Sequence, residues 1–195
     1  MGPLVVGAVW VEDDDVLSKI GVRDSKKLTP KTRERMYDEI VSKADGWHVV
    51  IASADDIDAR SLNDVELRMF AEAVSAHPST AVYADCPDVN ETKFSTRLDT
   101  LVDGPAIIAK HKADDTYPVV SAASIIAKVT RDRMIEELHE ELGDFGSGYP
   151  SDHYTMDFIE AWMKDNGCPP PHTRRSWEPI RQMISARSVR RLDDW

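Results

Sequence analysis

The 195-residue sequence has little of several features that would narrow its class at once. Its two cysteines, Cys86 and Cys168, are too few for a disulfide framework and lack the spacing of a zinc site. No apolar run is long enough to cross a bilayer, and residues 4–11 form one of the longest. No basic segment followed by an apolar segment and a cleavage site opens the chain, so no secretion signal is expected. These absences favour a cytoplasmic globular protein.

Positive charge is also scarce. The 24 Lys and Arg residues stand against 35 Asp and Glu residues, which gives a formal net charge of −11 and argues against nonspecific binding to nucleic acid. Of the acids 23 are Asp, and they are scattered along the chain. We interpret the acidity as a carboxylate-rich surface, as in halophilic proteins, rather than as an acidic partner-binding tail.

Hydrophobic residues make up 42% of the chain, which is a globular composition. Apolar patterns and turn signals predict strands that alternate with helices, so the fold class is α/β with a mixed sheet. The expected strands are 4–11, 47–52, 81–84 and 106–109. The expected helices are 30–42, one from 61 onward, 119–142, 154–166 and a last basic helix after residue 177.

The most informative segment is SAASIIAKVTRD, residues 121–132. On a helix, Ser121, Ser124, Lys128 and Asp132 fall on one side, because they are spaced by three, four and four residues. Burying such a stripe is costly unless it lines a site. The alternative is structural: small polar residues admit a neighbouring helix, and Lys128 pairs with Asp132.

Asp85 follows a short apolar strand and precedes Cys86 and Pro87. A carboxylate at the carboxyl end of a buried strand is well placed for a site in an open α/β sheet. The alternative is an aspartate that caps a turn. Together, Asp85 and Asp132 would suit Mg²⁺ or Mn²⁺, which prefer carboxylates, water and phosphate oxygens.

Two loops carry weaker signals. Residues 24–28 place Lys26 and a hydroxyl just before a helix start, where they could contact phosphate or form only a solvated turn. In Gly148-Tyr149-Pro150, a conformationally free glycine and a rigid proline flank the tyrosine ring. This arrangement favours stacking on a sugar or base, unless the ring folds back onto the core.

These segments together resemble the ribonuclease HII family, the type 2 ribonucleases H, and most closely its archaeal members. The matching stretches are GPLVVGAV (2–9), DSKKLTPK (24–31), VYADCPDVN (82–90), KADDTYPVVSAASIIAKVTRDR (112–133), GDFGSGYPSD (143–152) and RSW (175–177). The resemblance implies a ribonuclease H-like fold, in which helices flank a mixed central sheet and the C-terminal part is helical. It also implies a catalytic core over residues 1–142 and a helical substrate-binding region with a tail over 143–195.

The implied activity is endonucleolytic cleavage of the RNA strand of RNA–DNA hybrids and at ribonucleotides embedded in duplex DNA. Hydrolysis would be assisted by two metal ions, Mg²⁺ or Mn²⁺, and leave 3′-hydroxyl and 5′-phosphate ends. Asp85 and Asp132 resemble the catalytic metal ligands, and Tyr149 resembles the residue that senses the 2′-hydroxyl. The positions that resemble substrate contacts are Lys26, Lys112, Ser121 and Ser124, and we add Lys128 from the polar stripe.

The sequence departs from the family at one point. An Asp-Glu-Ala-Gly-Arg-Gly segment should precede Gly2-Pro3-Leu4, and the 195 residues do not contain it. That segment would supply two of four catalytic carboxylates and the first central strand. We expect Met1 to be an internal methionine of a longer protein, the alternative being a genuine short form. In either case we expect residues 1–195 to be weakly active or inactive, and poorly stable.

Other functions stay open. A non-catalytic module that binds RNA–DNA hybrids would keep Tyr149 and the phosphate contacts but lack the chemistry. Another nuclease of the same superfamily, such as a junction resolvase, fits the segments GSGYP and SAAS less well. The C-terminal residues 189–195, with Leu192 and Trp195, resemble a degenerate sliding-clamp-binding peptide, unless they form only a frayed tail. The family resemblance implies a monomer.

Overall fold

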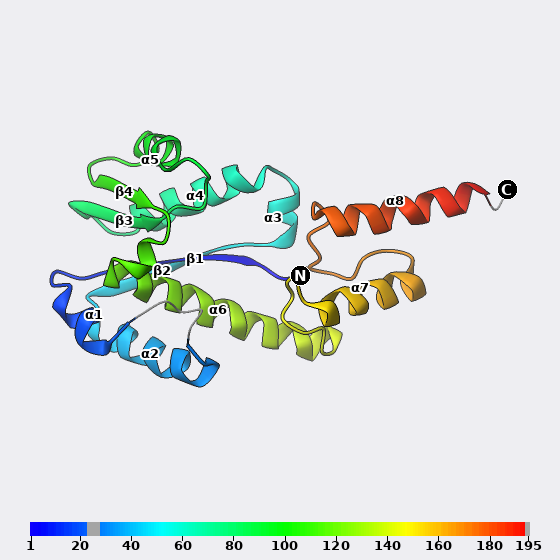
Figure 1. Ribbon diagram of the computed structural model, residues 1–195, viewed down its shortest axis with the longest axis horizontal. Coiled ribbons are helices and arrows are strands. Elements are labelled where there is room, and N and C mark those ends of the chain that lie inside the picture. Colours follow the sequence, from blue (N-terminus) through cyan, green and yellow to red (C-terminus); the bar gives the residue numbers. More distant parts are fainter. Residues whose placement is uncertain (23–27, 194–195) are drawn as a thin grey trace. The chain divides into compact units, whose positions relative to one another are not determined.

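The computed structural model describes residues 1–22 and 28–193, and their side chains as far as residue 187. Strands and helices alternate along the chain (Figure 1), as the sequence predicts. The elements are β1 (Leu4–Trp10), α1 (Asp15–Ile20), α2 (Pro30–Lys43), β2 (Gly46–Ala52), α3 (Ala54–Asp58), α4 (Leu62–Ser75), β3 (Ala81–Asp85), α5 (Glu91–Asp99), β4 (Ala106–Lys110), the 3₁₀ helix η2 (Ala113–Asp115), α6 (Pro118–Leu142), α7 (His153–Asn166) and α8 (Glu178–Asp193).

Local signals in the sequence explain where the long helices begin and end. Helix α2 starts as expected, because the Thr29 side chain accepts a hydrogen bond from the Thr32 amide at 3.2 Å and Pro30 stands at the first helical position. Helix α7 ends at Gly167, whose φ of 80° is left-handed. Helices α1, α3 and α5 were not expected from the sequence. Helix α3 does carry a visible signal, a capping box between Ser53 and Asp56.

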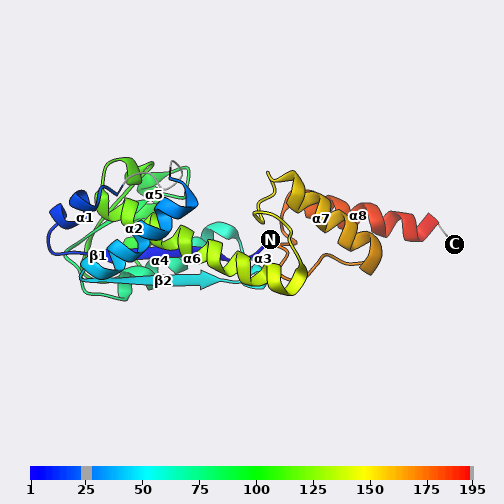
Figure 2. The ribbon, with the colours of Figure 1, turned by 90° about the horizontal axis from the view of Figure 1, so that it is seen from below.

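The expected single mixed sheet is wrong for the described chain. The strands form two separate pairs: β1 with β2, which run side by side in Figures 1 and 2, and β3 with β4. The second pair is parallel, from Ala81 opposite Ala106 to Asp85 opposite Lys110, and α5 lies on the crossover between its strands. The two pairs stay separate because no strand among the described residues bridges β1 and β3.

Strand β1 is less buried than its sequence predicts. All seven of its residues are apolar, yet Val9 alone is buried and the others are half-buried. Apolar strands of this kind are typical of sheets covered on both sides and paired on both edges. One side of β1 packs closely on α6, since a Cβ at Gly7 would lie 2.4 Å from the Ala123 carbonyl oxygen. Strand β2 pairs with one edge of β1. Among the described strands, none pairs with the other edge of β1.

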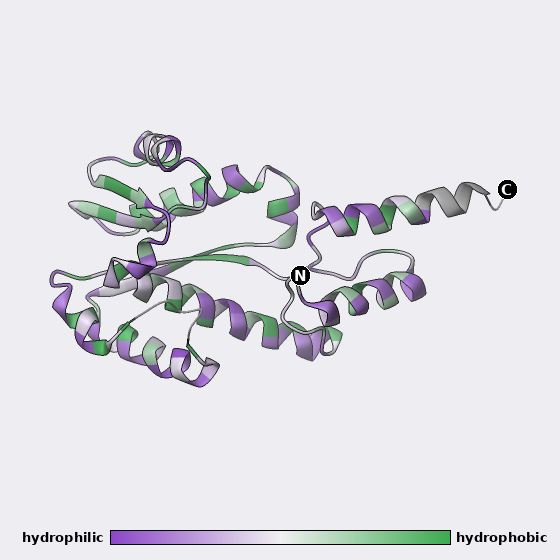
Figure 3. Cartoon of the chain, in the orientation of Figure 1, coloured by the Kyte–Doolittle hydropathy of each residue, from purple (hydrophilic) through white to green (hydrophobic). Residues whose placement is uncertain are grey.

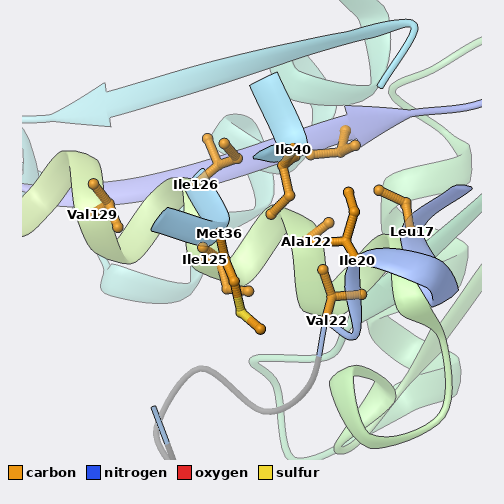
Figure 4. Close-up of a cluster of buried hydrophobic side chains, with 10 residues drawn as sticks. Leu17, Ile20, Val22, Met36, Ile40, Ala122, Ile125, Ile126 and Val129 are labelled. Atoms are coloured by element: carbon orange, nitrogen blue, oxygen red, sulfur yellow. The ribbon is translucent and has the colours of Figure 1, made fainter. Parts of the chain in front are cut away.

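The largest buried cluster joins α1 and α2 to the first half of α6 (Figure 4). Helix α6 contributes the buried side chains of Ala122, Ile125, Ile126 and Val129. Opposite them lie Met36 and Ile40 of α2. Burying side chains of this size is worth roughly 1.5–3 kcal/mol each. The cluster therefore holds α6 firmly by the side that adjoins its polar stripe.

Two further clusters complete the core. One packs α4 and α5 against β3 and β4, with Phe70 and Phe94 in an edge-to-face contact at 5.2 Å. The other contains Met1, Phe145, Ile159 and Ile180 and joins the N-terminal residue to the C-terminal helices. Figure 3 shows hydrophilic and hydrophobic residues interspersed along these helices. Over the described residues, no helix combines the length and the hydropathy needed to cross a membrane.

The chain forms two compact units. Unit 1 comprises Met1–Leu4, Ala52–Leu62 and Asp132–Trp195, and unit 2 comprises Val5–Ile51 and Asn63–Arg131. This division differs from the expected regions 1–142 and 143–195, because the boundary falls inside α6 and the N-terminal residues belong with the C-terminal helices. The expected regions describe a division by function and stay a prediction.

Candidate active site

The first group of expected site residues lies in unit 2, at the carboxyl end of β3. Asp85 is the last residue of this strand, opposite Lys110 at the end of β4. Its Oδ1 accepts a hydrogen bond from the Ala113 amide at 3.2 Å. The contact brings the turn at residues 111–115 against the carboxylate. Lys112, which is exposed and has a left-handed φ of 55°, stands in that turn next to the amide donor.

The turn after β3 is held by its own hydrogen bonds. The Cys86 amide donates to the Lys110 carbonyl at 2.9 Å, and the His111 Nε2 donates to the Asp88 carbonyl at 2.8 Å. Burial raises the pKa of the Cys86 thiol, which keeps it neutral. The thiol donates to the Asp88 carbonyl at 3.3 Å, so Cys86 serves this turn as a structural residue.

Glu91 ties the start of α5 to the same turn. Its carboxylate accepts hydrogen bonds from the His111 amide at 2.6 Å and from the Lys110 Nζ at 3.3 Å. The bond from the amide is the main reason that the pKa of Glu91 is lowered. Glu91 therefore stays charged and holds the two residues that precede Lys112.

The beginning of α6 is tied to this group by Ser121. The Ser121 hydroxyl, only 2% exposed, donates to the Asp114 carbonyl. The rings of Tyr83 and Tyr117 lie 4.4 Å apart and connect β3 to the residue before the helix. Ser121 thus positions the turn beside Asp85. Its expected contact with a nucleic-acid backbone stays a prediction.

The polar stripe of α6 is present. Ser124, Lys128 and Asp132 are half-buried, whereas residues on the adjacent side of the helix belong to the buried cluster. The three residues follow one another by successive helical turns. Asp132 is the first residue of its segment in unit 1, and Asp85 belongs to unit 2. Their expected pairing at one metal ion stays a prediction.

The described residues supply an incomplete set of metal ligands. In the ranges 1–22 and 28–193, no group of three or more His, Cys, Asp or Glu side chains is arranged to hold an ion. Asp85 offers one carboxylate, with one of its oxygens already bound to the Ala113 amide. A hard divalent cation in a protein site usually takes one or two carboxylates together with water and phosphate oxygens. Asp85 therefore fits as one ligand, but the full family set is not assembled.

The second group of expected site residues lies in unit 1, in the loop between α6 and α7. Gly146 and Gly148 both have φ of 76°, so the backbone takes left-handed positions on either side of Ser147. Tyr149 follows and is 39% exposed. The alternative of a ring folded into the core is therefore wrong, whereas the expected stacking on a sugar or base stays a prediction.

Two residues that the sequence analysis missed hold this loop. Thr155 is fully buried; its hydroxyl accepts from the Gly148 amide at 3.0 Å and donates to the Phe145 carbonyl at 2.8 Å. Asp152 caps α7 and also accepts from the amide and hydroxyl of Ser147, at 2.8 and 2.7 Å. These bonds from Ser147 are the chief reason that the pKa of Asp152 is lowered to about 2. An acid two residues before the expected helix 154–166 was the available signal.

The Arg-Ser-Trp match begins just after another missed residue, Arg174. This buried side chain donates from Nε to the Gly2 carbonyl at 3.2 Å and from a terminal nitrogen to the Pro3 carbonyl at 2.8 Å. Its guanidinium lies 5.3 Å from the centre of the Trp177 ring. Asp58 of α3 accepts from the next two backbone amides, at 2.7 and 2.9 Å. Unit 1 is thereby closed around the Gly-Pro segment.

Lys26, the remaining expected substrate contact, lies outside the described residues. The 24–28 loop therefore adds nothing to the observed site. The other residues fall into two groups. Unit 2 holds Asp85, Lys112, Ser121, Ser124 and Lys128, and unit 1 holds Asp132 and Tyr149.

The fold is of the ribonuclease H-like α/β class, as its likeness to two solved structures shows. The solved structure of ribonuclease H2 from Pyrococcus horikoshii OT3 is 40% identical with a TM-score of 0.89, and the match covers 96% of this chain and 92% of that one. The ribonuclease HII of the PCNA:RNase HII complex from Archaeoglobus fulgidus is 39% identical with a TM-score of 0.87, over 94% and 90% of the two chains.

The family follows from the sequence comparison. The family model for ribonuclease HII matches residues 1–180. Ribonuclease HII of Pyrococcus abyssi is 45% identical over 190 residues, which cover 94% of this chain and 85% of that protein. The chain belongs to the ribonuclease HII family, whose members are endoribonucleases. Because the family model matches from residue 1, the comparison does not show a missing segment, and that expectation stays a prediction.

Proposed function

We propose that this protein hydrolyses the RNA strand of RNA–DNA hybrids and cuts at ribonucleotides embedded in duplex DNA. Its products would carry 3′-hydroxyl and 5′-phosphate ends. The observation that carries the proposal is the position of Asp85, in a chain that belongs to this family. The carboxylate ends a parallel strand, next to the Lys112 turn and the start of α6. Ligands of open α/β folds bind at this edge of the sheet.

Asp85 and Asp132 are proposed as catalytic carboxylates that bind Mg²⁺ or Mn²⁺. Such an ion, when bound, lowers the pKa of a water nucleophile and neutralises charge on the leaving oxygen. The described residues contain no group of three ligands, and the 195 residues lack the Asp-Glu-Ala-Gly-Arg-Gly motif of the resemblance. We therefore propose that residues 1–195 alone have weak or no hydrolytic activity.

Substrate recognition is proposed to involve Tyr149 and several lysine and serine residues. Tyr149 would contact the ribose 2′-hydroxyl, the group by which a protein tells RNA from DNA at one position. Its exposure in a braced loop supports this role. The proposed contacts to the nucleic-acid backbone are Lys26, Lys112, Ser121, Ser124 and Lys128. Of these, Lys112 is exposed at the turn beside Asp85.

The test is cleavage of a DNA duplex that carries one ribonucleotide, with an all-DNA duplex of the same sequence as control. The purified 195-residue chain is assayed at high enzyme concentration with Mg²⁺ and with Mn²⁺. We expect slow cleavage at the ribonucleotide, leaving a 3′-hydroxyl end, and none of the all-DNA duplex. Cleavage of both duplexes would overturn the proposed specificity. Cleavage at the rate of a full-length relative would overturn the proposed weak activity.

The incomplete set of metal ligands favours a second candidate, a non-catalytic module that binds RNA–DNA hybrids. The same duplexes discriminate between the two functions. Tight and selective binding of the ribonucleotide-containing duplex, without any cleavage in either metal, would favour the binding module. Cleavage that Asp85→Asn abolishes would exclude it.

We also propose a sliding clamp as a partner, bound through Leu192–Trp195, and a monomeric protein that acts in the cytoplasm. The Archaeoglobus fulgidus relative described above was solved in a PCNA:RNase HII complex. The test compares the full chain with a chain that lacks residues 189–195 in binding to purified clamp. Equal binding by both chains would overturn the role of the tail.

The halophilic interpretation of the acidity likewise stays a prediction, and a comparison of folding at low and high salt would test it.

A further inference from the structure

The loop that carries Tyr149 is braced by two side chains from the beginning of α7. The Thr155 hydroxyl bonds to both ends of the segment that precedes Tyr149, accepting from the Gly148 amide and donating to the Phe145 carbonyl. A hydroxyl has one proton and two lone pairs, so it can serve both partners at once. The position of the residue directly before Tyr149 is therefore fixed relative to the buried ring of Phe145.

Asp152 braces the loop from the other side. One carboxylate oxygen accepts from the amide and the hydroxyl of Ser147, while the other accepts from the Tyr154 amide and caps the helix. The Asp152 amide donates to the Tyr149 carbonyl at 3.1 Å. Asp152 thus binds the backbone of Ser147 and of Tyr149, the two residues that flank Gly148. The lowered pKa of Asp152 agrees with a carboxylate that accepts several hydrogen bonds.

Gly146 and Gly148 alone would not hold the Tyr149 ring in one position. Left-handed glycines at 146 and 148 permit the turn, but glycine also has the largest backbone freedom to lose. A Cβ at Gly146 would lie 2.7 Å from an Asp152 carboxylate oxygen, so the brace packs directly on the glycine backbone. Ordering the loop before the substrate arrives lowers the entropy cost of binding. A fixed ring can also distinguish a 2′-hydroxyl from a hydrogen better than a mobile one.

We propose that Thr155 and Asp152 are positioning residues that hold Tyr149 ready to read a ribose 2′-hydroxyl. The inference rests on the proposed role of Tyr149 and deepens it, since specificity then depends on two side chains that need not touch the substrate.

The experiment measures Kd for a duplex with one ribonucleotide and for the matched all-DNA duplex, using the full 195-residue chain. The ratio of the two Kd values reports discrimination and does not depend on cleavage. Thr155→Val removes the hydroxyl at nearly constant shape, and Thr155→Ser restores it. Asp152→Asn keeps an oxygen that can cap α7 but replaces an acceptor of Ser147 by a donor. Asp157→Asn, exposed on the same helix, is the matched control for the charge.

We expect Thr155→Val and Asp152→Asn each to lower the discrimination ratio by about tenfold, as for the loss of one well-placed hydrogen bond. Binding of the all-DNA duplex should not change, because the brace acts on the 2′-hydroxyl reader only. Thr155→Ser and Asp157→Asn should keep the original ratio. Faster amide exchange at Ser147 and Gly148 in the two impaired variants would show that the loop has loosened.

Tyr149→Phe tests the proposed role of Tyr149 separately from the positioning role of Thr155 and Asp152. If it lowers the ratio while folded Thr155→Val and Asp152→Asn do not, the positioning role is wrong and the role of Tyr149 stands. If Tyr149→Phe leaves the ratio unchanged, the proposed role of Tyr149 fails and this inference fails with it. If Thr155→Val does not fold, the comparison of Asp152→Asn with Asp157→Asn decides.

Discussion

The Asp85 group in unit 2 and the Tyr149 loop in unit 1 are built in different ways. Asp85 is bound by an amide 28 residues away, and the turn beside it is held by the first turn of α6. Most hydrogen bonds that brace the Tyr149 loop join residues no more than ten positions apart, although the buried N-terminal amine of Met1 also donates to the Gly148 carbonyl. The first group depends on the pairing of strands and the packing of a helix. The second depends mainly on a short segment and the start of one helix.

This difference indicates that the position of Asp85, and not that of the Tyr149 loop, is sensitive to core packing around α6 and β3. A change in the packing of α6 or in the β3–β4 pair should disturb Asp85 while the Tyr149 loop keeps its form. A change in the loop should do the reverse. The following variants test this independence, and additive effects of sites that share no partners would be its signature.

The largest effect is expected for Asp85→Asn. The amide side chain has nearly the same shape and can still accept from the Ala113 amide, but it has no charge for a cation. We expect any cleavage at an embedded ribonucleotide to fall by about a hundredfold or more, since even residues behind metal ligands cost 10–100-fold. Single-turnover cleavage measures this, with Asp99→Asn at the exposed end of α5 as control. Unchanged cleavage would remove Asp85 from the catalytic group.

The next effect concerns stability. Gly7→Ala would place a Cβ 2.4 Å from the Ala123 carbonyl oxygen, and because this is the backbone of α6, the neighbour cannot rotate away. We expect the free energy of unfolding to fall by about 1–3 kcal/mol, measured by urea denaturation. Gly46→Ala is the matched control, since its Cβ meets the Trp10 side chain at the same distance. An equal loss in both variants would contradict the view that β1 is rigidly packed on α6.

A smaller loss is expected for Ser121→Ala. The change removes the hydrogen bond to the Asp114 carbonyl and leaves that buried acceptor with fewer donors. The free energy of unfolding should fall by about 1 kcal/mol. Amide exchange at Ala113 should become faster, whereas exchange at Gly148 should not change. Faster exchange at both positions would show that the two regions are coupled after all.

The smallest effect is a dependence on pH confined to the loop. The pKa of Asp152 is about 2 in the folded chain against an ordinary value of 3.8, so folding favours its charged form. The stabilisation is complete above the ordinary value and is lost as the pH falls through about 2. Protection of the Ser147 amide should therefore persist at pH 4 and decline toward pH 2. In Asp152→Asn this decline should be absent, and a decline that begins near neutral pH would contradict the assignment.

Much of the fold was predictable because its signals are local. The start of α2 at Thr29-Pro30, the end of α7 at Gly167 and the polar stripe of α6 follow from caps and helical spacing. The short helices were missed because they have fewer turns in which a period can show. Strand positions were predicted, but strand pairing was not, since the expected single sheet is two pairs. Pairing depends on which edges meet in space, and period-two patterns do not contain that information.

The candidate site shows the same limit. Asp85, the stripe residues and Tyr149 could be chosen from residue type and spacing. Asp152 could be expected only as a helix cap, and Thr155 and Arg174 not at all, because their importance lies in which backbone groups they bind. A buried threonine in a helix is usually only a packing residue. Its role here follows from a hydroxyl that hydrogen-bonds to two backbone groups of the loop.

The sequence by itself determined the helix starts, the left-handed glycines around Ser147 and the order of the family motifs, because each depends on neighbouring residues along the chain. Only the tertiary structure decided that the Ala113 amide meets Asp85 and that Arg174 binds the carbonyls of Gly2 and Pro3, more than 170 positions away. Contacts at such separations require a long loop to close, and they form when burial of the core outweighs that entropy. Local conformational preferences do not depend on that balance, so they do not predict these contacts.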